Sequence, residues 1–188
     1  ENAHYHVYNR GVDKRKIFLD NQDCSMFLHY LRLYLLPIEE LKEETLIGRT
    51  KIRFRNLNLS NEVSLLSFAL MPNHFHLLLK QSSVDGITKL MKRIMTAYVM
   101  YFNKKYKRLG PLFQHIYKSC LIDTDPYLLH LSRYIHLNST VITPTEINFS
   151  EFSSYPYYLN KKHATWIKPK EILDYFASSR KKTPKDIL

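Results

Sequence analysis

Two apolar runs, at residues 63–70 and 74–80, are separated by the tripeptide Met71-Pro72-Asn73. A proline followed by an asparagine between two apolar runs is typical of a turn that joins paired strands. The sequence therefore predicts an antiparallel hairpin over residues 63–80. The second run opens with two histidines at alternate positions, so the hairpin also contains a first candidate for a functional site.

Strand and helix patterns alternate on both sides of this hairpin. Aromatic and β-branched residues favour strands, whereas apolar residues that recur every three or four positions indicate helices. By these criteria we expect strands at 5–9 and 114–122, and helices from 21 to 36, from 87 to a point within 103–108, and from 126 to about 137.

The order β, α, β, β, α, β, α predicts an α+β fold, a split βαβ sandwich of ferredoxin type with an antiparallel sheet and one extra C-terminal helix. The length of 188 residues suits one domain over 1–188. Residues 38–62, an acidic patch followed by an alternating basic stretch, are interpreted as a solvated insertion of uncertain shape. Residues 144–188 are expected to form a peripheral tail.

The charge balance indicates the class of partner. Lys and Arg number 28 against 17 Asp and Glu, the formal net charge is +11, and 13% of the residues are aromatic. Cations bind phosphates and aromatic rings stack on unpaired bases, so nucleic acid is the expected partner. An anionic membrane surface would attract the same charge, but we find no strongly amphipathic basic terminal helix to anchor on one.

The apolar runs are far shorter than the roughly 20 residues that span a bilayer, and no basic-then-apolar secretory leader opens the sequence. Cys24 and Cys120 are far apart and form no CxxC motif, which supports neither a disulfide framework nor a cysteine zinc site. We therefore expect a soluble, cytoplasmic protein without a membrane partner.

His74-Phe75-His76 is the sharpest local signal in the sequence. Alternate residues of a strand point to the same face, so both imidazoles project together and can supply two ligands to one metal ion. The alternative is that two histidines alternate by chance on a half-buried strand. His4 and His6 have the same spacing, and we interpret them as structural residues or as residues that support the site.

Tyr134 and Asn138 are the second pair of candidate functional residues. Residues four apart on a helix share a face, so a hydroxyl and an amide oxygen are presented side by side. A phenol with a pKa of about 10 is a poor nucleophile, but a divalent cation favours phenolate and polarises a phosphate. Two imidazoles with an amide oxygen suit Mg²⁺ or Mn²⁺ better than structural zinc. The alternative is a core tyrosine near a C-capping asparagine. Tyr98 and Tyr101 lie on the apolar stripe of the long helix, where we expect core residues, and neither has an amide side chain four residues further on.

In its ordered motifs the chain resembles the single-tyrosine HUH transposases, where U is a bulky apolar residue, and especially the REP-associated tyrosine transposases of bacteria. The matching pieces are residues 5–7, 9–11, 71–78, 101–103, 110, 113–114, 118–119, 131–138 and 153–155. Two departures are Ser139, where the family usually has proline, and the longer stretch at 38–62.

The resemblance implies an enzyme that cleaves and joins single-stranded DNA containing an imperfect hairpin. Tyr134 would attack the scissile phosphate and form a 5′-phosphotyrosine link with a free 3′-OH, while His74, His76 and Asn138 would hold the metal. Independently of the resemblance, Arg10 and Lys118 are candidate phosphate contacts.

Other readings are a hairpin-binding module without catalysis, a relaxase or replication initiator, and a metal enzyme that does not act on nucleic acid. We expect a monomer, because the connection 123–126 is short, contains no glycine and is stiffened by Pro126. A dimer that exchanges the tyrosine helix is the alternative.

Overall fold

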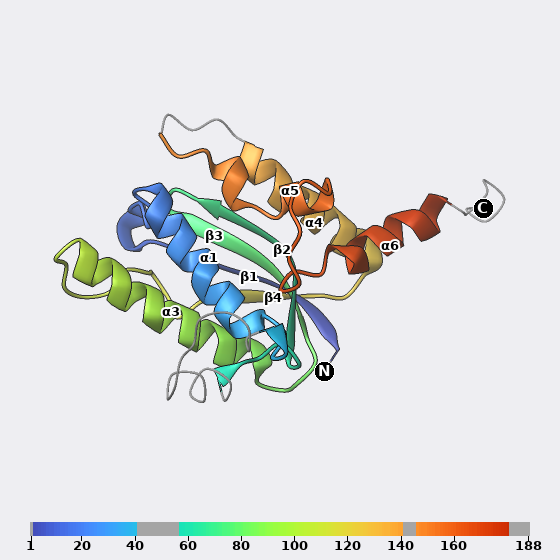
Figure 1. Ribbon diagram of the computed structural model, residues 1–188, viewed down its shortest axis with the longest axis horizontal. Coiled ribbons are helices and arrows are strands. Elements are labelled where there is room, and N and C mark those ends of the chain that lie inside the picture. Colours follow the sequence, from blue (N-terminus) through green and yellow to red (C-terminus); the bar gives the residue numbers. More distant parts are fainter. Residues whose placement is uncertain (1, 41–56, 141–145, 181–188) are drawn as a thin grey trace.

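The computed structural model describes residues 2–40, 57–140 and 146–180 (Figure 1). Its centre is a four-stranded antiparallel sheet in the order β2-β3-β1-β4. The strands are β1 (Ala3–Arg10), β2 (Val63–Met71), β3 (His74–Gln81) and β4 (Lys118–Ile122). This strand order is that of a split βαβ sandwich of ferredoxin type, so the predicted α+β fold is confirmed.

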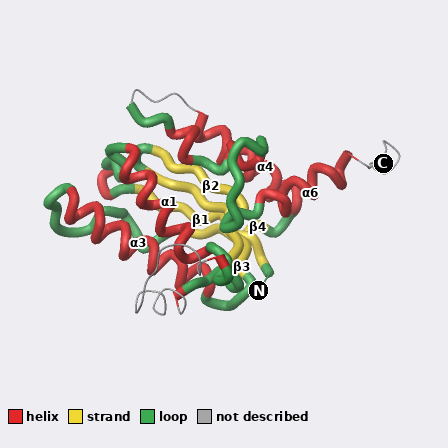
Figure 2. The backbone as a smooth tube through the Cα atoms, viewed as in Figure 1, coloured by secondary structure: helices red, strands yellow, loops and turns green. Residues whose placement is uncertain are grey.

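Helices cover both faces of the sheet (Figure 2). The three long ones are α1 (Asn21–Leu35), α3 (Gly86–Lys105) and α4 (Asp125–Thr140). α1 and α3 contact each other over one face, and α4 packs mainly against β2 on the opposite face. In the described residues, no helix combines the length and apolar character needed to cross a membrane.

Alternation along β3 supplies side chains to two separate cores. Phe75 and Leu77 are buried in the core beneath α1 and α3, whereas Leu78 belongs to the core beneath α4. Because neighbouring residues of a strand point to opposite faces, His74 and His76 lie on the α4 face. The hairpin turn falls between β2 and β3, so the predicted hairpin is confirmed.

β4 is shorter than the strand expected at 114–122, because pairing with β1 begins at Lys118. The buried Asn9 donates from Nδ2 to the carbonyls of His115, at 2.8 Å, and Ile116, at 3.1 Å. These carbonyls bond to a side chain and not to a neighbouring strand. The prediction of a strand over the first part of that range is therefore wrong, since a side chain about a hundred positions away holds this backbone.

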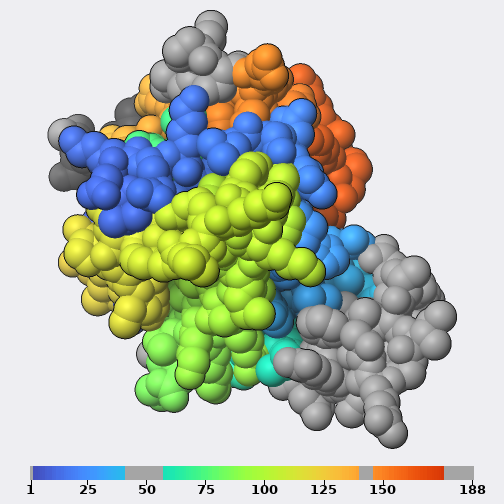
Figure 3. Space-filling model, turned by 90° about the vertical axis from the view of Figure 1, so that its left-hand side faces the viewer, coloured from blue at the N-terminus to red at the C-terminus, as the bar shows by residue number. Residues whose placement is uncertain are grey.

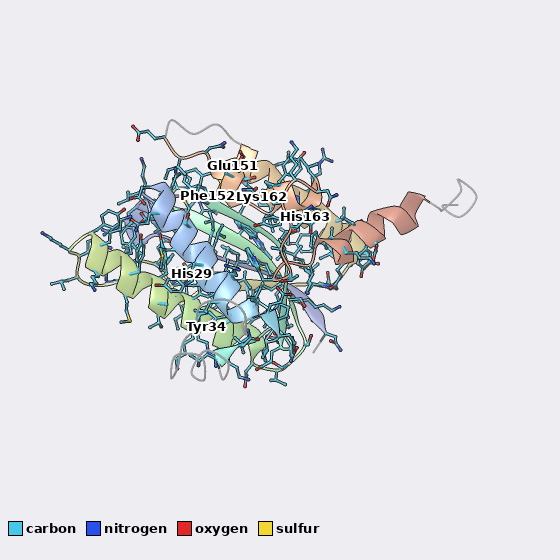
Figure 4. All side chains as sticks on the ribbon, viewed as in Figure 1. His29, Tyr34, Glu151, Phe152, Lys162 and His163 are labelled. Carbon is cyan, nitrogen blue, oxygen red and sulfur yellow. The ribbon has the colours of Figure 1, made fainter. Side chains whose placement is uncertain are left out.

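The segment 146–180 contains regular elements that the sequence did not predict. They are the 3-10 turn η3 (Phe149–Phe152) and the helices α5 (Tyr155–Tyr158) and α6 (Pro169–Arg180). Figure 4 labels Glu151 of η3 and Lys162, which follows α5. The carboxylate of Glu151 and the ammonium group of Lys162 lie 2.8 Å apart. Residues 41–56, most of the insertion expected at 38–62, lie outside the described residues.

This segment follows the outer edge of β2. Ser154 donates from its backbone nitrogen to the carbonyl of Phe68, at 2.9 Å, and the Phe68 nitrogen donates to Ser154 Oγ, also at 2.9 Å. Further along, the backbone nitrogen of Lys168 donates to the carbonyl of Leu65 at 2.8 Å. Trp166 is buried in the core beneath α1 and α3. The segment thus completes both the edge of the sheet and its core.

The fully buried carboxylate of Asp23 joins the start of α1 to the end of α3. It accepts hydrogen bonds from Leu19 N, Tyr101 Oη, Tyr106 Oη and Lys105 Nζ, at 2.8 to 3.0 Å. We expect Asp23→Ala to lower the free energy of unfolding by about 3 kcal/mol, because the Lys105 ammonium group and the other hydrogen-bond donors lose their buried acceptor. Urea unfolding followed by circular dichroism measures this change.

The control for this experiment is Asp123→Ala on the exposed connection between β4 and α4, which should change stability by less than about 0.5 kcal/mol. Equal losses in the two variants would contradict the role assigned to Asp23.

Candidate active site

A polar pocket of about 260 Å³ opens at one end of the sheet, on the face that α4 covers. Side chains from β1, β3, α4 and the segment that leads into β4 form its walls. The lining residues are Tyr8, Asn9, Arg10, His74, His76, Gln114, His115, Lys118 and Tyr134. The sequence predictions His74, His76, Tyr134, Arg10 and Lys118 thus meet in one place.

Strand register explains this meeting. β1 lies between β3 and β4, and its residue Tyr8 is paired with His76 on one side and with Lys118 on the other. Arg10 is paired with His74. Directly opposite residues on neighbouring strands point to the same face, so all of these side chains point toward the α4 side of the sheet.

Each of the two predicted ligands has one ring nitrogen held and one left for a ligand. His74 donates from Nδ1 to Asn73 Oδ1 at 2.7 Å, which leaves Nε2 with its lone pair. His76 Nδ1 lies 2.8 Å from His6 Nε2. The other nitrogen, His76 Nε2, is buried and has no hydrogen-bond partner. A buried polar atom without a partner is costly, and a ring held through its other nitrogen is typical of a metal ligand.

Tyr134 is the sequence-predicted nucleophile, and its ring lies beside one of these histidines. Its ring centroid is 5.8 Å from that of His76, in an edge-to-face arrangement, and its side chain is 44% exposed. The competing tyrosines lie on the other face of the sheet. Tyr98 is fully buried and donates to the carbonyl of Ile17, and Tyr101 donates to Asp23. Burial raises the pKa of Tyr98, which opposes formation of a phenolate there.

Comparison with known protein families matches the part of the chain that contains these residues. The family model described as "Transposase IS200 like" matches residues 39–138, more than half of the chain, and this range contains His74, His76, Tyr134 and Asn138. The chain belongs to the IS200-like transposase family. No curated protein matches it.

Among solved structures, the chain is similar to a REP-associated tyrosine transposase bound to a REP hairpin. The two share 10% identity with a TM-score of 0.49, over 89% of this chain and 92% of the other.

The pocket residues fit a divalent cation with mixed nitrogen and oxygen ligands. The partnerless His76 Nε2 and the free nitrogen of His74 supply two imidazole ligands. Among the residues that the structure describes, no group of three His, Cys, Asp or Glu side chains is placed to hold a metal. Amide, water or phosphate oxygens would complete such a site, and oxygens are the ligands that Mg²⁺ and Mn²⁺ prefer.

Electrostatics favour the neutral, ligating form of these rings. Burial lowers the pKa of His74 to about 4, with the positive charge of Arg10 acting in the same direction. Burial also lowers the pKa of His76 to about 3 and that of His6 to about 4. All three imidazoles are neutral at pH 7, and neutral imidazole is the form that binds metals.

Asn138 lies one helical turn after Tyr134 on α4, but it is not among the residues that line the pocket. Its amide nitrogen donates to the carbonyl of Tyr134 at 2.9 Å, a bond that does not involve its amide oxygen. Its role as third ligand stays a prediction. The supporting role expected of His6 fits its contact with His76, whereas His4 lies 3.1 Å from Glu171 of α6.

α4 is fixed in place on the side of the helix away from the pocket. His136, two residues after the predicted nucleophile, is buried, and its Nε2 lies 2.8 Å from Ser154 Oγ. Ser154 is bonded in turn to the backbone of Phe68 in β2. The tyrosine helix is therefore attached to its own sheet through the segment that follows it.

Sequence reasoning missed several pocket residues. Tyr8 continues the alternation of His4 and His6 along β1, and this signal could have placed it on the same face. Gln114 and His115 come from an irregular segment, for which periodicity gives no information. Asn73, which does not line the pocket, is predicted from sequence only as a turn residue, although its side chain also orients His74.

Proposed function

We propose that this IS200-like transposase cleaves and joins single-stranded DNA that contains a hairpin, as a metal-dependent tyrosine nuclease of the REP-associated type. The observation that carries the proposal is the Tyr134 ring beside His76, whose buried Nε2 has no partner. The hairpin and the REP-associated type follow from the motif resemblance, and the net charge of +11 agrees with a DNA substrate.

In the proposed reaction, Tyr134 Oη forms a bond to the scissile phosphorus while the bond from phosphorus to the 3′ oxygen breaks. The phenol loses a proton and the leaving 3′ oxygen gains one, so a 5′-phosphotyrosine link and a free 3′-OH result. Attack of a 3′-OH on that link reverses the reaction and joins strands.

The other pocket residues would bind and orient the DNA. Arg10 and Lys118 flank the histidines and would contact phosphate oxygens. His74 and His76, with Asn138 as predicted third ligand, would hold Mg²⁺ or Mn²⁺. When bound, the cation would stabilise negative charge on the phosphate.

The test is to incubate the protein with a pool of single-stranded hairpin oligonucleotides and Mn²⁺ and to look for a covalent protein–DNA adduct by denaturing gel electrophoresis and mass spectrometry. We expect an adduct whose modified peptide contains Tyr134. Hairpin binding without any adduct would favour the non-catalytic DNA-binding module instead.

We also expect each site to be built within one chain, so that a monomer is active. Only Asp123 and Thr124 separate β4 from α4, and Tyr134 reaches His76 of its own chain. A mixture of Tyr134→Phe protein with His74→Ala/His76→Ala protein should therefore stay inactive in the adduct assay. Restored cleavage in the mixture would show that two chains share a site.

A further inference from the structure

An apolar groove of about 650 Å³ lies between α3 and the segment 111–117, next to the candidate active site. Figure 3 shows these two parts of the chain side by side, α3 in yellow-green and the following segment in yellow. Apolar side chains predominate in both walls. They include Met91, Met95, Val99 and Met100 from α3, and Phe113 and Ile116 from the segment.

Some apolar side chains of the groove are exposed to solvent and are not buried in the core. Ile116 is 81% exposed and Met100 is 69% exposed, although both lie among apolar neighbours. Grouped apolar side chains on a surface are unfavourable in water and mark binding sites more often than single exposed residues do. Methionine side chains are flexible and polarisable, and they adapt to occupants of different shape.

Charge selects the class of occupant. From Gly86 to Ile122, a range that supplies both walls, the sequence contains eight Lys or Arg residues and no Asp or Glu. One of these cations, Lys92, lines the groove. An occupant must therefore combine flat or apolar surfaces with negative charge, and single-stranded nucleic acid has both, in its bases and its phosphates.

The groove adjoins the candidate active site. His115 lines both the apolar groove and the polar pocket that contains His74 and His76. The two walls of the groove are joined by Thr88 Oγ1 and Tyr117 Oη, which lie 3.0 Å apart. A strand whose phosphate lies in the pocket can thus continue past His115 into a groove that already has a defined shape.

We propose that this groove binds unpaired bases of the DNA strand whose scissile phosphate occupies the candidate active site. The inference rests on the proposed function and adds the surface that would hold the bases beside the cleavage point. Base faces contact Met100, Ile116 and their neighbours, while Lys92 faces the phosphates.

The test compares two single-stranded probes by fluorescence anisotropy: an oligothymidine of about twelve nucleotides, and the same backbone with abasic sites in place of the bases. We expect the wild-type protein to bind oligothymidine about tenfold more tightly than the abasic strand. The double variant Met100→Ser/Ile116→Ser should lose most of that difference by weakening only oligothymidine binding. Leu109→Ser is the matched control, since Leu109 is 95% exposed, lies on the same basic stretch and does not line the groove.

Other results would overturn the inference. Unchanged binding of both probes by the double variant would remove the groove from the binding surface, and an equal loss for both probes would mean that bases are not what it contacts. A lower molar mass of the double variant in light scattering would identify the groove as an interface between copies of this chain. The adduct assay is run in parallel. An adduct without base-dependent binding would contradict only the proposal that the groove binds bases. Base-dependent binding without an adduct would contradict only the proposed nuclease function.

Discussion

Tyr134→Phe is expected to abolish formation of the covalent DNA adduct, lowering its rate by more than about 10⁴-fold, while hairpin binding stays within about twofold of wild type. The substitution removes the attacking oxygen and keeps the ring that packs against His76. Single-turnover adduct formation with Mn²⁺ measures the first quantity, and fluorescence anisotropy with labelled hairpin DNA measures the second.

Two tyrosines serve as controls for this result. Tyr8 lines the same pocket, so Tyr8→Phe tests whether any pocket phenol is sufficient. Tyr98 lies in the core beneath α1 and α3, so Tyr98→Phe tests for indirect effects of removing a hydroxyl. Both variants should form the adduct. If the adduct persists in Tyr134→Phe but disappears in Tyr8→Phe, the nucleophile is Tyr8 of β1 and not Tyr134.

His76→Ala is expected to reduce cleavage by about a thousandfold or more, and excess EDTA should reproduce the loss in the wild-type protein. The substitution removes the buried nitrogen that has no partner in the protein and that would bind the cation. Mn²⁺ binding, followed by isothermal titration calorimetry or by the electron paramagnetic resonance of free Mn²⁺, should weaken in the same variant.

His130→Ala is the matched control, because His130 is exposed on α4 and does not line the pocket. It should keep both cleavage and Mn²⁺ binding. Full cleavage by the wild-type protein in EDTA would contradict the metal mechanism, whatever the histidine variants do.

The parts of this molecule that depend on local pattern were predictable from sequence. The alternation of His74, Phe75 and His76 placed two imidazoles on one face, and the helical period placed Tyr134 on an element that begins near Pro126. The order of the elements then implied the sheet that brings them together.

What could not be predicted depends on contacts between distant parts of the chain. Asn9 shortens β4 by bonding carbonyls about a hundred residues away, and no local pattern signals such a bond. The same holds for Ser154, which links His136 of α4 to the backbone of β2. For Asn138 the local pattern is correct but insufficient. Helical spacing places this residue near Tyr134 but does not determine where its amide oxygen points.

The segment that runs along β2 has a consequence for aggregation. β2 and β4 are the outer strands of the sheet, and an unpaired outer strand offers its N–H and C=O groups to strands of other molecules. β4 is only five residues long, which limits this danger, but β2 has nine residues and is apolar. A chain shortened after α4 would keep His74, His76 and Tyr134, yet it would lose the backbone bonds that occupy this edge. We therefore expect residues 146–180 to limit self-association through the sheet, and we expect shortened versions to form β-rich aggregates even with every pocket residue in place.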